Sequence, residues 1–380
     1  MNSPGSPSNG NDGPVGHIVV LAESVGATQT ISFAQPLALP SERSSGRPHR
    51  LSMLADDKAW DDEAGRRALL DRLEPTVLVL SRYGTPRALA MLQQARRRGV
   101  PVLFHIDDDL LDVPMSLGKA KYDFYHQPER LACLRATMDT ADGVYASTGP
   151  LARRLAEHGI RSPIVAGDLY CSPAPGTPPV PLPATVPVIG YMGTGGHSQD
   201  LALVMPAIVA LMRQWPELRF ETFGTIKPPA EMAAFPGRYA HHPGVADYDG
   251  FLEKLGGLGW WVGLAPLEDN PFNRCKADTK WVEYTWCGMA VVAADLPVYH
   301  RACSRSSGLL ARDVDDWREA IASLLRSEAR RHAQVQAARD HLRLGYDRGR
   351  LRQQVLDVIG SLSSRPSTSA STTVNTPHAT

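Results

Sequence analysis

The 380-residue sequence contains no apolar stretch that approaches the roughly 20 residues of a membrane-spanning helix. It also has no excess of either charge, because 40 Lys and Arg residues balance 40 Asp and Glu residues. A balanced chain has no overall field that attracts nucleic acid or an anionic membrane surface. We therefore expect no nucleic-acid partner, and any anionic ligand must be bound by a local group of cations.

Several signatures of other protein classes are missing. The five cysteines are scattered and form neither a C-x-x-C pair nor a zinc-binding spacing. Residues 1–16 are rich in Gly, Ser, Asn and Pro and lack the charged-then-apolar pattern of a secretion signal. No Ser-His-Asp or Cys-His arrangement has a recognisable local spacing. These observations favour a cytoplasmic location and give no support to nucleophilic hydrolysis.

Short apolar runs alternate with amphipathic segments along most of the chain. The apolar runs predict buried strands at 17–21, 76–80, 101–106, 143–146, 188–191, 219–223, 260–264 and 290–293. Helices are predicted near 31–39 and at 61–73, 87–98, 129–141, 151–157, 201–214, 248–255, 279–287 and 317–362. His241 and His242 are assigned to a loop. The alternation predicts an α/β protein with mostly parallel sheets.

A proline-rich segment interrupts this alternation between residues 173 and 187. Such a sequence can neither continue a helix nor pair within a sheet, and 380 residues exceed what one core usually organises. We therefore predict an N-terminal domain at 17–175, a linker at 176–187 and a C-terminal domain at 188–345. Residues 1–16 and the Ser/Thr-rich tail 363–380 are expected to be disordered.

A glycine-rich bend follows the predicted strand 188–191. Gly193, Thr194 and Gly195 precede a helix, and His197 lies at its start. Backbone N–H groups without bulky side chains can bind a diphosphate at such a helix N-terminus. A nicotinamide-binding loop would require G-x-G-x-x-G, but Ser198 replaces the third glycine and the next strand does not end in an acidic residue. The bend therefore favours a diphosphate ligand and disfavours a dehydrogenase.

Lys276, Lys280 and Glu283 are spaced by four and three residues, so a helix would place them on one face. Two ammonium groups suit a diphosphate, and a carboxylate accepts hydrogen bonds from a ribose diol. The alternative is a solvated helix with salt bridges, which the surrounding aromatic and aliphatic residues disfavour. The spacing therefore predicts a nucleotide-sugar site.

A third group of polar residues follows the predicted strand 101–106. His105 and the carboxylates of 107–109 could position an acceptor hydroxyl, with Asp108 as a hydrogen-bond acceptor and His105 as a base. The carboxylates could also hold Mg²⁺, or could simply cap the following turn. We assign Asp108 and His105 to the acceptor side and predict no metal site.

Together these motifs resemble the GT-B glycosyltransferases, and most closely the retaining family four (glycosyl transferases group 1) and its bacterial surface-polysaccharide members. The resemblance extends over residues 17–345 and is strongest from 187 to 295. It rests on Gly190-Tyr-x-Gly193-Thr194-x-x-His197, Tyr248-x-x-Phe251, Gly263-Leu-Ala-Pro266 and Phe272-Asn273-x-x-Lys276-x-x-x-Lys280-x-x-Glu283-Tyr284. The segment 106–109 is similar to an acidic strand end in the same proteins.

The resemblance implies two doubly wound Rossmann-like domains that face a cleft, with a helix at 346–362 that packs back on the N-terminal domain. It implies transfer of a hexosyl or related sugar from a nucleotide-sugar to a glycan or lipid-linked acceptor, with retention of configuration and without a metal. The bend and the two lysines would bind the diphosphate and Glu283 the ribose. A lipid-linked acceptor would bring the protein into peripheral contact with the inner membrane.

The chain departs from the family at one position. Cys275 stands eight residues before Glu283, where the family often has a first glutamate that contacts the donor sugar. Sugar recognition would then use other groups, such as Asn273 or Asp278. Two alternatives stay open: a nucleotide-sugar epimerase of the same fold, and a non-catalytic scaffold that binds nucleotide-sugars.

Overall fold

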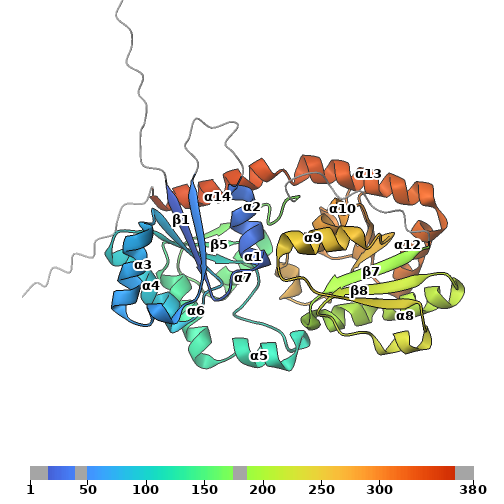
Figure 1. Ribbon diagram of the computed structural model, residues 1–380, viewed down its shortest axis with the longest axis horizontal. Helices are drawn as coiled ribbons and strands as arrows, with labels where there is room; N and C mark the ends of the chain where they lie inside the picture. The colour runs from blue at the N-terminus through green and yellow to red at the C-terminus, as the bar shows by residue number, and fades with distance from the viewer. Residues whose placement is uncertain (1–15, 39–48, 174–185, 364–380) are drawn as a thin grey trace, which may run out of the picture.

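The computed structural model describes residues 16–38, 49–173 and 186–363. It has two halves, each built around a six-stranded parallel sheet with helices on both faces (Figure 1). In spatial order, the N-terminal sheet contains β2 (Arg50–Ala55), β1 (His17–Ala22), β3 (Val77–Ser81), β4 (Val102–Ile106), β5 (Gly143–Ala146) and β6 (Ile164–Ala166). The C-terminal sheet contains β12 (Leu309–Ala311), β11 (Ala290–Ala294), β10 (Val262–Ala265), β7 (Val188–Gly193), β8 (Arg219–Gly224) and β9 (Tyr239–Pro243). The expected α/β class with two doubly wound domains is confirmed.

All eight predicted strands are present, and they occupy the four central positions of each sheet. Every residue of β3, β4, β5 and β11 is buried, because helices cover both faces of these strands. The four strands that the sequence did not predict are the edge strands β2, β6, β9 and β12. Assigning His241 and His242 to a loop was wrong, since both lie in β9.

The helices of the N-terminal half follow the strands in the expected alternation. They are α1 (Ala27–Gln29), which continues through the π-helical turn Thr30–Ala34 into α2 (Gln35–Leu37), then α3 (Glu63–Leu73), α4 (Pro86–Arg97), α5 (Lys119–Tyr125), α6 (Pro128–Thr140) and α7 (Gly149–Glu157). Thr148 caps α7 by accepting a hydrogen bond from the Leu151 N–H group at 3.2 Å. Helix α5 was not predicted.

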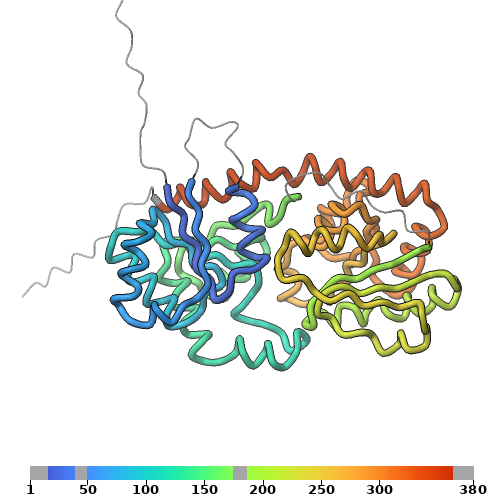
Figure 2. Tube along the Cα trace, in the orientation of Figure 1, coloured from blue at the N-terminus to red at the C-terminus, as the bar shows by residue number. Residues whose placement is uncertain are grey.

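The C-terminal half contains seven helices in the described part of the chain. They are α8 (Ser198–Gln214), α9 (Tyr248–Gly257), α10 (Thr279–Trp286), α11 (Pro297–His300), α12 (Val314–Arg326), α13 (Glu328–Gly345) and α14 (Arg348–Ser363). Tracing the chain in Figure 2 shows that α13 runs along the C-terminal half and that α14 continues across to the N-terminal half. The Gln354 side chain fixes α14 there, because its oxygen accepts hydrogen bonds from the Asp168 and Leu169 N–H groups at 2.8 and 3.0 Å.

Strand order reverses at one point in each sheet. β1 lies between β2 and β3, and β7 lies between β8 and β10. In doubly wound sheets the crevice at such a switch point, beyond the carboxyl ends of the strands, is the usual ligand site. The loops after β7 and β10 are therefore the first place to look for a site in the C-terminal half.

A loop of the C-terminal half also docks on the N-terminal half. Phe272 and Cys275 are both buried and belong to the hydrophobic core of the N-terminal half. The Thr148 hydroxyl donates a hydrogen bond to the Cys275 carbonyl at 2.7 Å. The short 3₁₀ turn Asn273–Cys275 thus lies against the start of α7 and joins the two halves.

The segments expected to be disordered, 1–16 and 363–380, and the predicted linker 176–187 lie outside the described residues except for 16, 186–187 and 363. Among the helices of the described ranges, none combines the length and apolar character needed to cross a membrane.

Candidate functional site

The glycine bend lies directly beyond the carboxyl end of β7. Gly193 is the last residue of the strand, and a 3₁₀ turn (Gly195–His197) leads into the 17-residue helix α8. Thr194 and Gly195 are exposed, and the Gly195 N–H group donates to the Thr225 hydroxyl at 3.3 Å. The N-terminus of a long helix carries a partial positive charge. The bend therefore presents backbone to the junction in a form suited to an anion.

Helix α10 is fixed at the switch point of the C-terminal sheet by Tyr284. The Tyr284 hydroxyl accepts a hydrogen bond from the Met192 N–H group at 2.9 Å and donates one to the Leu264 carbonyl at 3.1 Å. Its ring fits only because residue 263 is glycine, since a Cβ there would lie 2.6 Å from the ring. These contacts hold α10 against the ends of β7 and β10. Lys280 of this helix lies near the bend, with its Nζ 5.8 Å from the centre of the Tyr191 ring.

Lys276 does not lie on α10, so the prediction that one helical face carries both lysines and Glu283 was wrong. The helix begins at Thr279, and the backbone at Lys276 is extended. The Lys276 ammonium nevertheless lies close enough to Lys280 and His197 to lower the pKa of both side chains. The two cations reach the bend from different elements.

The groups around the bend perturb one another strongly. The Lys280 ammonium, followed by burial, lowers the pKa of His197 to about 4, against the hydrogen bond of His197 Nδ1 to Asp200 at 2.8 Å. Burial raises the pKa of Glu283 to about 7, although Lys280 and a hydrogen bond from Tyr248 oppose the shift. Burial also lowers the pKa of Lys280. Two ammonium groups thus lie close enough to lower the pKa of a neighbouring histidine, and an anionic ligand would stabilise that arrangement.

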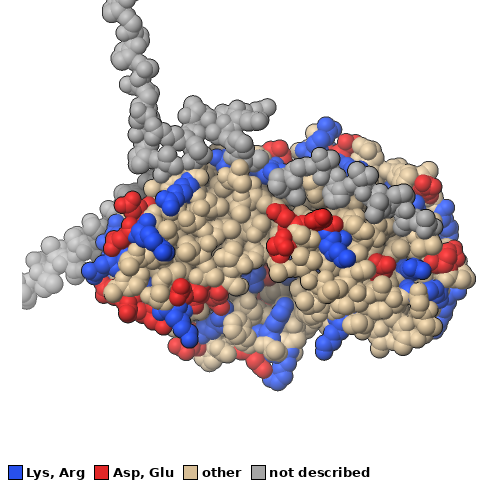
Figure 3. Space-filling view, in the orientation of Figure 1, with Lys and Arg blue, Asp and Glu red and all other residues tan. Residues whose placement is uncertain are grey.

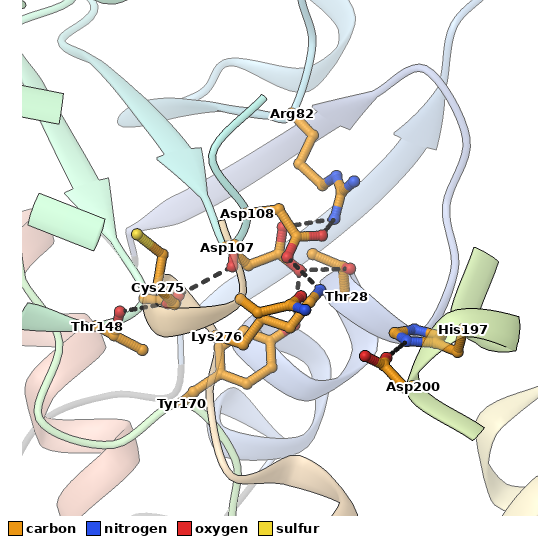
Figure 4. Close-up of polar contacts among 12 residues, drawn as sticks. Thr28, Arg82, Asp107, Asp108, Thr148, Tyr170, His197, Asp200, Cys275 and Lys276 are labelled. Carbon is orange, nitrogen blue, oxygen red and sulfur yellow. Dashed lines mark hydrogen bonds and ion pairs between the residues drawn. The ribbon is translucent and has the colours of Figure 1, made fainter. Parts of the chain in front are cut away.

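The three carboxylates after β4 have different partners, and Figure 4 shows those of Asp107 and Asp108. Asp109 is fully buried and pairs with Arg154 at 3.1 Å and His158 at 3.0 Å within the N-terminal half. Asp107 accepts hydrogen bonds from the Thr28 and Tyr170 hydroxyls, both at 2.9 Å. These two carboxylates serve structural contacts.

Asp108 is the carboxylate that faces the C-terminal half. It lies between Arg82, at 3.2 Å, and Lys276, at 2.9 Å (Figure 4). Although burial opposes the shift, Lys276 and then Arg82 hold the pKa of Asp108 well below its usual range. Asp108 is therefore ionised and can accept a hydrogen bond, but it is a weak base.

His105 does not reach the junction. Its side chain is 0 % exposed, with Nδ1 3.0 Å from the Ser81 hydroxyl and the ring packed edge-on against Phe33. Burial lowers its pKa to about 4. His105 lies next to the last residue of β4, near the strand end as expected, but its side chain points into the core. Direct contact between His105 and an acceptor is therefore not supported.

The residues considered for sugar recognition are held by other contacts. Asn273 is buried and donates its side-chain N–H to the Glu268 carbonyl at 3.0 Å. Asp278 accepts a hydrogen bond from the Tyr346 hydroxyl. Cys275 packs into the core of the N-terminal half, on the side of the loop away from His197 in Figure 4. The position of the family's first glutamate is thus used for contact between the two halves.

Sequence reasoning missed Arg82 and gave no individual role to Asp200 or Tyr248. Arg82 directly follows β3, so the rule that ligands bind beyond strand ends could have identified it. Asp200 is buried in the first turn of α8, and its second oxygen accepts a hydrogen bond from the Glu268 N–H group at 2.8 Å, which ties the loop after β10 to the bend. No group of three or more His, Cys, Asp or Glu side chains suited to a metal ion occurs within the described ranges.

A polar cavity of about 390 Å³ lies beyond the ends of β1 and β3, at the switch point of the N-terminal sheet. It is lined by Glu23, Ser24, Thr28, Gln29, Arg82 and Tyr125, among others. Arg130 closes one side, pairing with Glu23 at 2.6 Å and covering the Phe124 ring at 4.0 Å. The two halves therefore each present a polar site at their switch points.

No protein-family model and no curated protein matches the sequence. Solved structures do match the fold. HepE from Anabaena, in complex with UDP-glucose, superposes with a TM-score of 0.63 at 13% identity, covering 91% of this chain and 99% of HepE. The UDP-forming α,α-trehalose-phosphate synthase from Burkholderia xenovorans gives a TM-score of 0.57 at 12% identity, covering 92% and 99% of the two chains.

A third structure, a TarM variant from S. aureus in complex with fondaparinux, α-GlcNAc-glycerol and UDP, gives a TM-score of 0.55 at 11% identity. The match covers 80% of this chain and 59% of TarM. At these identities the likeness concerns the fold, which in all three comparisons includes both halves of the chain. Together with the two doubly wound sheets and their facing switch points, it shows that the chain has the GT-B fold.

Proposed function

We propose that the protein is a glycosyltransferase that transfers a sugar from a nucleoside-diphosphate sugar to a hydroxyl-bearing acceptor. One observation carries this proposal: Lys276, Lys280 and His197 converge beside a glycine bend at the C-terminal switch point, opposite Asp108 of the N-terminal half. The fold of UDP-bound HepE supports the same assignment.

In the proposed complex the donor diphosphate lies against the bend. Gly193, Thr194 and Gly195 would offer backbone, while Lys276 and Lys280 would neutralise its charge. Glu283, 8 % exposed and in electrostatic contact with Lys280, would accept hydrogen bonds from the ribose diol once ionised. The diphosphate would relieve the repulsion among the cations that the ligand-free site contains.

The chemistry follows from this charge distribution. As the acceptor hydroxyl bonds to the anomeric carbon, the bond from that carbon to the phosphate oxygen breaks and negative charge grows on the diphosphate. Cations aimed at that charge stabilise the transition state more than the ground state. The departing phosphate oxygen keeps the electron pair of the broken bond, and we assign it as the base that takes the hydroxyl proton. Asp108 would orient the hydroxyl rather than deprotonate it.

We assign the acceptor to the cavity beyond β1 and β3. Its hydroxyl, carboxylate and amide side chains, with the Phe124 and Tyr125 rings beside them, suit a carbohydrate hydroxyl group. A lipid-linked glycan would require the protein to approach the inner membrane from the cytoplasmic side. The five unpaired thiols are consistent with that reducing compartment.

The finer assignments rest on the sequence motifs. The segment from Phe272 to Tyr284 supports a relationship to the retaining family four and a role in bacterial surface-polysaccharide synthesis. We propose that the reaction retains configuration and needs no metal, since lysines already supply the charge that a metal would provide. Transfer that is unchanged in EDTA would support the last point, and transfer restored only by Mg²⁺ would contradict it.

The test is a transfer assay with UDP-glucose, and then with other nucleotide-sugars, against a panel of glycan acceptors. Release of nucleoside diphosphate only in the presence of acceptor supports the proposal. Conversion of the donor to an epimer without acceptor would identify an epimerase instead. Tight donor binding without turnover across the whole panel would identify the non-catalytic scaffold that Cys275 in place of glutamate leaves open.

A further inference from the structure

A segment of the N-terminal half crosses the junction and touches the glycine bend. We call residues 114–127 the crossing segment; it contains a 3₁₀ turn (Met115–Leu117) and helix α5, which lies below the gap between the halves in Figure 1. The Leu117 carbonyl oxygen and Lys121 Nζ lie 3.2 and 2.8 Å from the position that a Cβ on Gly196 would occupy. The crossing segment thus brings a lysine of the N-terminal half against a loop of the C-terminal half.

Gly196 leaves room for this close approach. A Cβ there would displace the Lys121 ammonium and crowd the Leu117 carbonyl oxygen. Gly196 itself is buried, whereas the neighbouring Thr194 and Gly195 are exposed. The bend is therefore covered by the crossing segment on one side and stays accessible on the other.

Lys121 lacks the counter-charge that its neighbour on the same helix has. Lys119 pairs with Asp123 at 2.6 Å on the outer surface, whereas Lys121 forms no ion pair with any described residue. Partial burial lowers the pKa of Lys121, the Lys276 ammonium lowers it further, and Asp108 opposes both. Lys121 as a whole is exposed, so a ligand can reach its ammonium.

Three ammonium groups therefore gather at one place from three different elements. Lys276 lies within electrostatic range of Lys121 on one side and of Lys280 on the other. Asp108 is shared between Lys276, at 2.9 Å, and Arg82, at 3.2 Å, and Arg82 also pairs with Asp107 at 2.6 Å. In Figure 3, Lys and Arg side chains gather at the lower margin of the junction, where α5 lies in Figure 1. Within the described ranges neither Lys121 nor Lys280 forms an ion pair, so both ammonium groups can contact an anion with more than one negative charge.

We propose that Lys121 binds the donor diphosphate from the N-terminal side of the cleft, as the third ammonium of a site whose other two are Lys276 and Lys280. This inference rests on the proposed function, because it assumes that a nucleoside diphosphate occupies the glycine bend. It adds a residue from the opposite domain, on a segment for which the sequence predicted no structure. The diphosphate would then be held by both halves at once.

The inference is tested by comparing a nucleoside diphosphate with the nucleoside that lacks the phosphates. Binding of UDP and of uridine is measured by calorimetry on the full chain, with ADP, GDP and dTDP and their nucleosides as further probes. Lys121→Ala should weaken the diphosphate at least about tenfold, the loss of one charge-assisted contact, and leave the nucleoside unchanged. Lys119→Ala, two residues earlier on the same helix and already paired with Asp123, is the matched control and should leave both affinities unchanged.

Lys280→Ala separates failure of this inference from failure of the proposed function. If Lys280→Ala weakens binding of the diphosphate and Lys121→Ala does not, the inference about Lys121 is wrong and the proposed donor site stands. If no diphosphate binds the unmodified chain, both are wrong. A purely structural role for Lys121 would instead lower the melting temperature and weaken diphosphate and nucleoside alike, which would also overturn the inference.

Discussion

Replacing Lys280 with methionine tests the donor site most directly. The substitution keeps the length of a half-buried side chain and removes its charge beside the glycine bend. If the ammonium makes one charge-assisted contact with a phosphate, its loss costs about 1.5–3 kcal/mol, or about 10- to 150-fold in affinity. A nucleoside without phosphates should bind Lys280→Met as it binds the unmodified protein.

The same substitution has a second consequence in the absence of ligand. Lys280 is the largest cause of the lowered pKa of His197, so Lys280→Met should raise that pKa from about 4 toward its ordinary value. The His197 ring can be followed by NMR across a pH titration, and the diphosphate affinity by calorimetry. Both measurements report on the same ammonium, one through a ligand and one through a neighbouring side chain.

Lys254 provides the control. It lies on the exposed face of α9 in the same domain, so Lys254→Met removes an equal charge away from the bend. A raised His197 pKa together with an unchanged diphosphate affinity in Lys280→Met would refute the proposed donor site while confirming the geometry. If neither quantity changed, the position of Lys280 itself would be wrong.

Substitutions at three further positions test other parts of the site. Only the ionised form of Glu283 can accept two hydrogen bonds from a ribose diol, and burial raises the pKa of Glu283 to about 7. The affinity for UDP-glucose should therefore increase from about pH 6 to 8. Glu283→Gln should remove that pH dependence. Asp108→Asn should strengthen UDP binding about two- to fivefold, because the carboxylate no longer competes with the diphosphate for Lys276, and it should slow sugar transfer. Weaker UDP binding in this variant would contradict the role assigned to Asp108. Cys275→Ala should leave the affinity for UDP within about twofold of the unmodified value. Cys275→Glu should lower the melting temperature by at least about 5 °C, because it buries a charge. An active and equally stable Cys275→Glu variant would show that the position still faces the donor.

The sequence predicted the centre of each sheet and missed its edges for one physical reason. Central parallel strands are buried on both faces, so they appear as unbroken apolar runs such as Val77–Ser81. Edge strands are half-exposed, and Tyr239–Pro243 contains two histidines and a proline, which is also typical of a loop. Arg50–Ala55 has four apolar residues out of six but is only partly buried, and its short run was not recognised as a strand. The two histidines of β9 were therefore assigned to a loop although they pair with β8.

The candidate site was predictable where it depends on strand ends and local spacing. The hydrophobic pattern indicates where β7 ends and where α10 lies. The glycine bend directly follows β7, and Lys280 and Glu283 both lie on α10. The position of Lys276 depends on where α10 begins, and the position of Cys275 depends on which half of the protein its loop contacts. Neither can be predicted from the sequence spacing between Lys276, Lys280 and Glu283. Lys121 lies far from the bend in sequence, and only the crossing segment brings it there. The prediction that His105 contacts the acceptor failed for a simpler reason, because a shift of one residue along a strand moves a side chain to the opposite face of the sheet.

The ion pair between Lys276 and Asp108 links donor binding to contact between the two halves. It joins a loop of the C-terminal half to the end of β4, and it uses the same ammonium that we assign to the diphosphate. A donor would therefore exchange one partner of Lys276 for another, while Lys121 stays beside the bend through the crossing segment. The buried turn at Cys275 and helix α14 hold the halves together by separate contacts, so this exchange does not require the domains to part. Asp108, released from Lys276 as the donor arrives, would then be free to orient the acceptor hydroxyl at the moment when the diphosphate is in place.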